Sequence, residues 1–498
     1  MDWPARDAKI HYRQTHFVHD DAPPVRHCVK PLFTLPESAR ETLLRRYADR
    51  IEVNPSLSRA LVSYQSNRKR SNYRWFKYKE GFSASLVEYL IGRFQLVDGV
   101  VLDPFAGSGA TLFVAREHGL PSVGIELLPV GIHAVRARLA AEQIDRREFA
   151  AAVAAIAAGK WKVEPDPTLS FQHLRITVGA FPDAAERGLA QFRTYLRDCI
   201  SSDEVRQVLD FACFSILESI SYTRKDGQYL RWDSRAPRGL PGKAFDKGPI
   251  AEFETALLAR LREIMEDLDE PALFAKVSDS ALPRLDILSG SCLELLPSLQ
   301  AESSDALITS PPYCNRYDYT RTYALELAYL GIDEQKLKGL RQSLLSCTVE
   351  NRSKVDWLHT FYAAQRSPGT LKAALQAFEG QEALQEVLAA LERKASRGEL
   401  NNANVPRMVR NYFLESAVAV FEWARILKPG GQVALVNDNV RYGGEEVPVD
   451  LILSDLAERA GFTTERIWTL SRGKGNSSQQ MGAHGRTELR KCVYIWRR

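Results

Sequence analysis

The segment VVLDPFAGSGATLFVAREHGLPSVGIE, residues 100–126, decides the predicted fold. It begins with a short apolar strand, Val100–Leu102, and continues through a glycine-containing loop, residues 103–111. A helix over 112–118 follows, and a second strand covers 122–125. This alternation of strand, loop and helix is typical of a parallel α/β sheet. The segment therefore predicts the α/β class.

The same alternation extends outward in both directions. Further strands are expected at 285–288, 305–309, 432–436, 464–470 and 491–496. Helices are expected at 36–51, 83–94, 134–143, 412–426 and 449–459. Ser83 is a plausible N-cap for the second of these helices. Two long helical segments interrupt the pattern, which predicts a doubly wound sheet with helical insertions.

These changes of pattern divide the chain into six expected parts. The catalytic domain would consist of 81–143, 284–330 (which holds the sequence SPPY) and 405–498. The other parts are an N-terminal segment with a basic and aromatic run, 1–80, and two helical inserts, 144–283 and 331–404.

The bulk properties exclude several classes of protein. The chain has 498 residues and a formal net charge of +4, an excess too small to indicate a polyanionic partner by itself. Its seven cysteines are dispersed without a CxxC pair, so we expect reduced thiols and no metal site. We see no secretory signal and no run of about 18 apolar residues, which predicts a cytoplasmic protein without a membrane partner.

The loop Asp103–Gly109, DPFAGSG, follows a strand and opens a helix. Glycines let the backbone approach a ligand, and the N–H groups at a helix start bind carboxylate or phosphate. A plain tight turn explains the loop alone equally well. However, Glu126 ends the next strand, where a carboxylate can accept hydrogen bonds from both hydroxyls of a ribose. Together they favour a cofactor site over a solvated surface glutamate.

The sharpest motif is Thr309-Ser310-Pro311-Pro312-Tyr313, again at the end of a strand. The two prolines fix the backbone, so that its carbonyls can accept from an amino group. The serine adds a hydroxyl, and the tyrosine offers a flat face for a planar ring. The alternative is a rigid turn, which the nearby cofactor loop disfavours.

DPFAGSG followed by SPPY resembles the signature motifs of the DNA amino-methyltransferases. In that family the FxGxG motif binds S-adenosylmethionine, and the proline motif holds the target base. The segments YKEGFSASLVEYLI, DILSGSCLELL and RILKPGGQVALVNDN also resemble parts of the family, so the likeness covers most of the chain. It implies cofactor contacts from Lys79, Phe82, Ser83, Asp103, Pro104, Phe105, Gly107, Ser108, Gly109, Glu126, Leu127, Ser291 and Cys292. Ser291 departs from the family, which commonly has Asp there.

The resemblance implies a Rossmann-like methyltransferase fold, mostly parallel with an antiparallel C-terminal strand. It also implies catalysis by Ser310, Pro311, Pro312 and Tyr313. The amino group of a flipped-out base would donate to the serine Oγ and the first proline carbonyl, and the tyrosine would stack on the ring. Serine in this motif is typical of enzymes that modify N4 of cytosine, and aspartate of those that modify N6 of adenine. Cys314 suggests a rival nucleophile, but C5-cytosine enzymes place that cysteine directly after proline.

Basic residues predict where double-stranded DNA binds. They occur in the run Tyr64–Lys79, in the loop 224–247, in the loop 471–491 and just after SPPY. A solvated surface explains any one of these segments equally well. The predicted nucleic-acid contacts are Arg68, Arg70, Arg224, Lys225, Arg231, Arg316 and Arg321. Base recognition is expected in the two helical inserts.

Four other functions compete with N4-cytosine methylation of DNA. They are N6-adenine methylation, RNA amino-methylation, a non-catalytic DNA-binding module and, more weakly, an NAD enzyme. The intact motifs disfavour a non-catalytic module, and the GxGxxG spacing of NAD enzymes is missing. A restriction or defence nuclease is a possible partner.

Overall fold

The computed structural model describes residues 38–79, 81–226, 229–238, 244–269, 282–365, 368–471, 474–475 and 488–498. The N-terminal segment before Ser38, most of the 471–491 loop and parts of the 224–247 loop lie outside the described residues.

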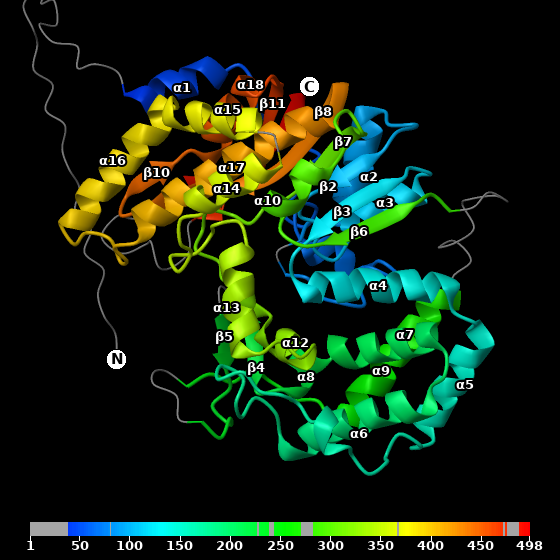
Figure 1. Cartoon of the computed structure of the whole chain (residues 1–498). Helices are drawn as coiled ribbons and strands as arrows, with labels where there is room; N and C mark the ends of the chain where they lie inside the picture. Colours follow the sequence, from blue (N-terminus) through cyan, green and yellow to red (C-terminus); the bar gives the residue numbers. More distant parts are fainter. Residues whose placement is uncertain are drawn as a thin grey trace, which may run out of the picture. The chain divides into compact units, whose positions relative to one another are not determined.

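A mixed eight-stranded sheet forms the centre of the chain from Ser38 onward (Figure 1). Its order is β1 (Ile51–Val53), β11 (Thr463–Thr469), β14 (Lys491–Arg497), β8 (Leu427–Asp438), β7 (Ser304–Thr309), β2 (Val101–Asp103), β3 (Ser122–Glu126) and β6 (Leu285–Ser289). Only β14 runs antiparallel to its neighbours in this sheet. The expected Rossmann-like methyltransferase fold with an antiparallel C-terminal strand is therefore confirmed.

Alternating side chains of the central strands enter two separate hydrophobic clusters. Ile308 and Ala434 face a cluster that includes α2 (Ala84–Phe94) and α3 (Ala110–Glu117). Their neighbours Leu307 and Leu435 face the opposite cluster. The helices on that side are α10 (Cys292–Leu295), α14 (Val355–Ala364), α15 (Pro368–Glu379), α16 (Glu382–Ser396), α17 (Val405–Ile426) and α18 (Val449–Arg459). Because strand side chains alternate, this apolar pattern requires helices on both faces of the sheet.

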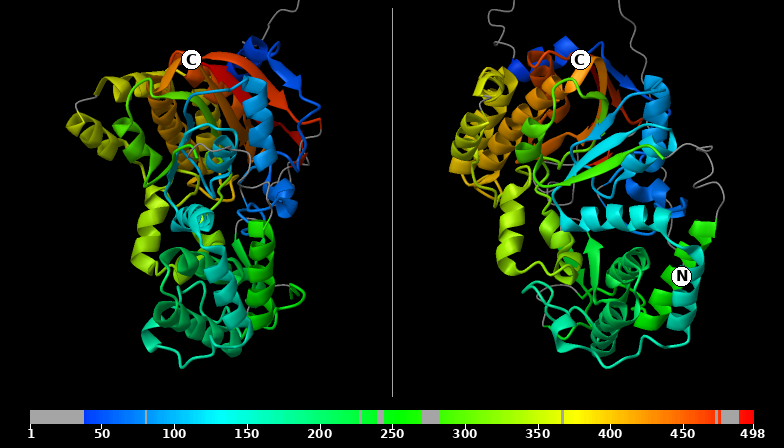
Figure 2. Two further views of the ribbon diagram at one scale, coloured as in Figure 1. Left: turned by 90° about the vertical axis from the view of Figure 1, so that its right-hand side faces the viewer. Right: turned by 45° about the vertical axis from the view of Figure 1, so that its right-hand side comes forward.

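A third cluster forms the core of a helical group below the sheet (Figures 1 and 2). Its elements from the first insert are α5 (Arg146–Ala157), α6 (Asp183–Cys199), α7 (Asp203–Ser215), α8 (Leu217–Ile220), the hairpin β4 (Thr223–Asp226) and β5 (Tyr229–Trp232), and α9 (Phe253–Asp269). The helix α4 (Pro129–Gln143) joins it to the sheet.

Elements from later in the chain complete this helical group. They are α11 (Tyr319–Thr322), α12 (Ala324–Tyr329) and α13 (Glu334–Ser343). The second insert is thus divided, because α13 packs with the first insert while α14–α16 pack on the sheet side with α17.

No described helix is long and apolar enough to cross a membrane.

The N-terminal helix is shorter than the sequence predicts. The helix α1 covers Ala39–Tyr47, with Ser38 and Glu41 forming a capping box. Of the residues expected to continue it, 48–50 form a turn and Ile51 begins β1, which pairs in parallel with β11 at the edge of the sheet. Outside the eight-stranded sheet, β9 (Val440–Tyr442) and β10 (Glu445–Val447) form a hairpin directly after β8.

Candidate active site

The loop after β2 adopts a conformation that needs glycine. Gly107 and Gly109 have φ angles of +54° and +81°, in the left-handed region that side chains disfavour. A Cβ on Gly107 would also lie 2.9 Å from the ring of Tyr78. The loop therefore passes closely under that tyrosine before α3 begins.

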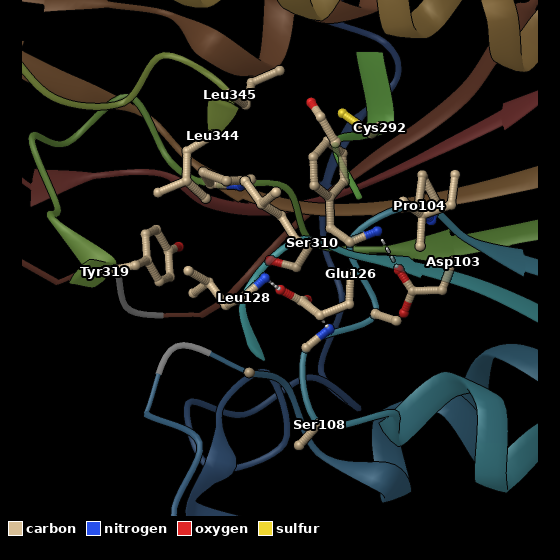
Figure 3. A pocket seen from close by; sticks show the side chains of 18 of the residues that line it. Asp103, Pro104, Ser108, Glu126, Leu128, Cys292, Ser310, Tyr319, Leu344 and Leu345 are labelled. Carbon is tan, nitrogen blue, oxygen red and sulfur yellow. Dashed lines mark hydrogen bonds between the residues drawn. The ribbon is translucent and has the colours of Figure 1, made fainter. Parts of the chain in front are cut away.

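Glu126, at the end of β3, holds this loop in place. Its carboxylate accepts hydrogen bonds from the backbone N–H of Gly107 at 2.7 Å and of Leu128 at 2.6 Å (Figure 3). The side chain is buried, and that burial raises the pKa of the carboxyl to about 7, although the two hydrogen bonds act to lower it. Each carboxylate oxygen keeps a lone pair for a further donor.

Asp103 joins the glycine loop to the end of β7. Its carboxylate accepts from the hydroxyl of Thr309 at 2.5 Å and from the N–H of Phe105 at 3.1 Å. The hydroxyl of Thr111 donates to the Ile308 carbonyl at 3.1 Å, which adds a second link between the same elements. Burial raises the pKa of Asp103 to about 6 against the effect of these bonds.

Ser310 is oriented by the neighbouring strand β8. Its Oγ is placed to donate its proton either to the carbonyl of Val436 at 3.0 Å or to the hydroxyl of Tyr313 at 3.1 Å. A serine hydroxyl has one proton and two lone pairs. Because the proton has these two acceptors, the lone pairs remain available to accept from another group.

The residue after SPPY is a fully buried cysteine. Burial raises the pKa of the Cys314 thiol well above its usual range, which disfavours the thiolate that a nucleophile requires. Its carbonyl accepts from the buried hydroxyl of Tyr442 at 2.6 Å. The cysteine therefore belongs to the packing beneath the motif.

Most of the predicted cofactor residues line one pocket, together with Ser310 and Pro312 of the motif (Figure 3). Those in the lining are Phe82, Asp103, Pro104, Phe105, Gly107, Ser108, Glu126, Leu127, Ser291 and Cys292.

The remaining predicted residues lie outside this lining. Lys79 Nζ donates to the carbonyl of Lys225 at 3.3 Å, and Ser83 caps α2 from a buried position. Gly109 caps α3, and Pro311 borders a small apolar cavity behind the motif.

Sequence analysis missed several residues of the lining. Tyr78, Tyr319 and the segment Ser343–Leu345 at the end of α13 also border the pocket. The Oγ of Ser291 donates to the Ser343 carbonyl at 3.0 Å, so this segment closes one side. No motif marks Ser343–Leu345 in the sequence, because its position depends on how the second insert packs.

The basic and aromatic run Tyr64–Lys79 is largely internal, which corrects its prediction as a DNA-binding segment. Tyr73, Trp75, Phe76 and Tyr78 are all at most 7% exposed. Arg70 pairs with Glu88 at 2.9 Å and Glu117 at 2.7 Å, which occupies its charge within the protein. Of the two predicted DNA contacts in this run, only Arg68 is exposed without a carboxylate partner among the described residues.

Lys225 does not reach the surface either. Its side chain is 2% exposed and forms an ion pair with Glu326, whose side chain is 1% exposed. A lysine held in this way cannot contact a phosphate, so the prediction for this residue is wrong. Its neighbour Arg224 is exposed and has no carboxylate partner among the described residues.

The two arginines after SPPY differ in their surroundings. Arg316 has a φ of +66° and donates to the side-chain oxygen of Asn401 at 2.9 Å. Arg321 lies 3.2 Å from Asp318 and 3.1 Å from Glu350, and its side chain is 47% exposed. Groups of His, Cys, Asp or Glu arranged to hold a metal do not occur within the described ranges.

The parallel sheet, the glycine loop and the proline motif at adjacent strand ends define a methyltransferase of the DNA amino-methyltransferase class. Residues 41–134 match the family described as DNA methylase. The chain is 44% identical over 463 residues to the Type II methyltransferase M.AvaI of Nostoc sp., covering 92% of this chain and 93% of that protein. It is 41% identical over 479 residues to the Type II methyltransferase M.BsoBI of Geobacillus stearothermophilus, covering 93% and 92%.

The chain belongs to this family of Type II DNA methyltransferases. Its substrate is DNA, and its methyl donor is S-adenosylmethionine (AdoMet).

Gly131, which lies outside the pocket, gives a test of how closely the glycine loop packs against α4. A Cβ on Gly131 of α4 would lie 2.3 Å from the Gly107 carbonyl oxygen and 2.9 Å from Glu126 Cγ. Gly131→Ala must therefore displace the loop, and we expect AdoMet affinity measured by calorimetry to fall about tenfold or more. Gly92→Ala in α2 is the control, because its Cβ would meet nothing within 4 Å. Equal AdoMet affinity in the two variants would contradict the packing argument.

Proposed function

We propose that this enzyme transfers the methyl group of AdoMet to N4 of a cytosine that is flipped out of double-stranded DNA at a specific sequence. The choice of base rests on the identity of Ser310, because serine in this motif is typical of the enzymes that modify N4 of cytosine. Its hydroxyl proton has acceptors in the Val436 carbonyl and the Tyr313 hydroxyl, so its lone pairs can accept from an amino group.

The residues of the pocket fit AdoMet. The left-handed glycine loop lets the backbone line the pocket directly beside Tyr78, where a Cβ on Gly107 would not fit. Glu126 at the next strand end keeps lone pairs for the two ribose hydroxyls. Tyr78, Phe82 and Leu127 supply apolar surface. When bound, AdoMet supplies an electrophilic methyl group on a sulfonium centre.

Some of the predicted cofactor residues act indirectly in this proposal. Ser83 fixes the start of α2, and its Oγ donates to the Leu61 carbonyl at 2.6 Å. Gly109 sets the start of α3, and Lys79 donates its backbone N–H to the hydroxyl of Tyr323 at 2.8 Å. They hold the walls of the pocket and do not line it.

Catalysis depends on how the chain orients a weak nucleophile. The lone pair of an exocyclic amino group is conjugated with the ring, so it must be freed before it can attack a methyl group. Hydrogen bonds from the amino group to Ser310 Oγ and to the Pro311 carbonyl would favour tetrahedral nitrogen and free the lone pair. The N–C bond forms as the C–S bond breaks, and the nitrogen then releases a proton to solvent.

Two further residues of the motif position the base. Pro312 lines the pocket beside Ser310 and keeps the backbone rigid. Tyr313 would stack on the flipped ring and release the contact that its hydroxyl makes with Ser310. We also propose that a restriction nuclease specific for the same sequence is the cognate partner.

A methyl-transfer assay on unmethylated genomic DNA, followed by mass spectrometry of the nucleosides, tests the proposal. We expect N4-methylcytosine from the native protein. Ser310→Ala should lower kcat about 100-fold or more, because it removes an acceptor aimed at the reacting nitrogen, while AdoMet binding changes little. Ser298→Ala removes an exposed hydroxyl elsewhere and should leave the rate unchanged.

Three results would contradict this proposal. N6-methyladenine would show that Ser310 does not select cytosine. Methyl groups in RNA alone would exclude DNA as the substrate of this chain, and full activity of Ser310→Ala would remove its catalytic role.

The pKa of Glu126, about 7, predicts pH-dependent cofactor binding. The carboxylate form can accept from both ribose hydroxyls, and protonation removes one acceptor as the pH falls below that value. The Kd for AdoMet should therefore rise by up to about tenfold per unit as the pH falls from about 7 to about 5. Glu126→Gln should bind more weakly with a flatter profile, while Glu294→Gln, at an exposed position, should keep the native profile. A native profile in Glu126→Gln would show that another group titrates.

A further inference from the structure

The hairpin β4–β5 sorts its basic residues onto two faces. In register, Thr223 lies opposite Trp232, Arg224 opposite Arg231, and Lys225 opposite Leu230. Thr223, Lys225, Leu230 and Trp232 are all at most 9% exposed. Because side chains alternate along a strand, the two arginines lie together on the opposite, outward face.

The inner face is fixed to the helical group by buried charge. Lys225 pairs with Glu326 of α12, a helix that follows SPPY closely in the chain. Its ammonium also lies 5.1 Å from the ring centroid of Phe76 and 4.9 Å from that of Tyr323. Removing either partner would leave an uncompensated buried charge, which is strongly destabilising. The hairpin is therefore held in one position on α12.

Stacked rings connect this anchor to the cofactor pocket. Tyr323 stacks on Tyr78 with ring centroids 5.2 Å apart and an interplanar angle of 16°. Tyr78 in turn lines the pocket. On the other side, Nζ of Lys247 donates to the carbonyls of Glu218, Ser221 and Thr223, which secures the start of the hairpin.

The outer face has an arrangement that folding alone does not favour. Two positive charges directly opposite each other in a ladder destabilise a hairpin. Arg224 has no carboxylate partner among the described residues. Arg231 lies 3.1 Å from Asp226 and packs over the ring of Phe245 at 3.9 Å. These contacts fix the direction of its guanidinium while leaving its side chain 41% exposed.

A short helix connects the hairpin to the cofactor pocket. The helix α11, which contacts β5, carries Arg321, whose charge is paired with Asp318 and Glu350. It begins at Tyr319, which lines the cofactor pocket. The hairpin that carries the arginine pair is therefore separated from the cofactor pocket by this one short helix. Figure 1 shows β4 and β5 under α13, next to α12.

We propose that the β4–β5 hairpin enters the major groove of the DNA beside the target base, where Arg224 and Arg231 recognise guanines. The major groove accommodates a two-stranded ribbon, and arginine donates two hydrogen bonds to O6 and N7 of guanine. A guanidinium held by an aromatic ring and a carboxylate suits this fixed, bidentate contact better than a phosphate contact, which does not need a fixed direction. This inference rests on the proposed DNA methylation.

The test begins with the sequence that the native enzyme modifies, obtained by mapping methylated sites in genomic DNA. Duplexes with single base-pair changes in that sequence are then compared by kcat/KM. We expect Arg224→Ala and Arg231→Ala each to lose about 10- to 100-fold of discrimination at one G·C pair. Arg231→Lys should recover DNA affinity without recovering that discrimination, because lysine lacks the bidentate fork.

Controls separate this result from loss of folding or of activity. Arg187→Ala removes an exposed arginine from α6 and should keep the native specificity. AdoMet affinity should be unchanged in all four variants.

Two outcomes would overturn the inference while leaving the proposed function intact. One is an unchanged pattern of sites in both alanine variants. The other is an equal loss on every duplex with a weaker salt dependence, which would indicate phosphate contacts. Failure of the native enzyme to methylate any DNA would instead contradict the proposed function.

Discussion

A buried hydrogen bond from the hydroxyl of Thr309 to the carboxylate of Asp103 joins the two halves of the active site. Asp103 begins the glycine loop, and Thr309 directly precedes the proline motif. The two loops are 206 residues apart in sequence, yet β2 and β7 are adjacent in the sheet. The relative position of the cofactor loop and Ser310 therefore depends on this one contact and its neighbour from Thr111.

The site retains buried acidic groups that folding alone would disfavour. Burial raises the pKa of both Asp103 and Glu126, so keeping either one ionised costs free energy that only local hydrogen bonds offset. Such perturbed groups are common at functional sites. Here one carboxylate joins two loops, and the other faces the pocket from the end of β3.

Much of the fold could be predicted from the sequence because local signals and tertiary packing agree there. Ser83 caps α2 as predicted, and α18 has the expected bounds. The glycine loop and SPPY lie at strand ends, so their meeting follows from a parallel sheet. The sequence could not reveal that α13 packs with the first insert and closes the pocket, since this depends on long-range packing that no local motif marks.

Basic residues in the sequence were the least reliable guide to the DNA contacts, because some of them bind acidic groups inside the protein. In the run before the cofactor loop, Arg74 and Trp75 bind the buried carboxylate of Asp267, which lies in α9. Side chains of the kind that bind DNA therefore hold this helix in place instead. In the β4–β5 hairpin, alternation turns Lys225 inward and Arg224 outward, although they are adjacent in sequence. Only the strand register separates a cation that is buried in the protein from one that is exposed.

The most direct test of this account is the single-turnover rate of methyl transfer at saturating AdoMet and DNA in Thr309→Val and Thr309→Ser. Valine keeps the shape of threonine and removes the bond to Asp103, whereas serine keeps the hydroxyl. The account predicts that the valine variant is slowed about tenfold or more and that the serine variant stays near the native rate. Equal rates in both variants would show that the Asp103–Thr309 contact does not set the geometry of the reaction.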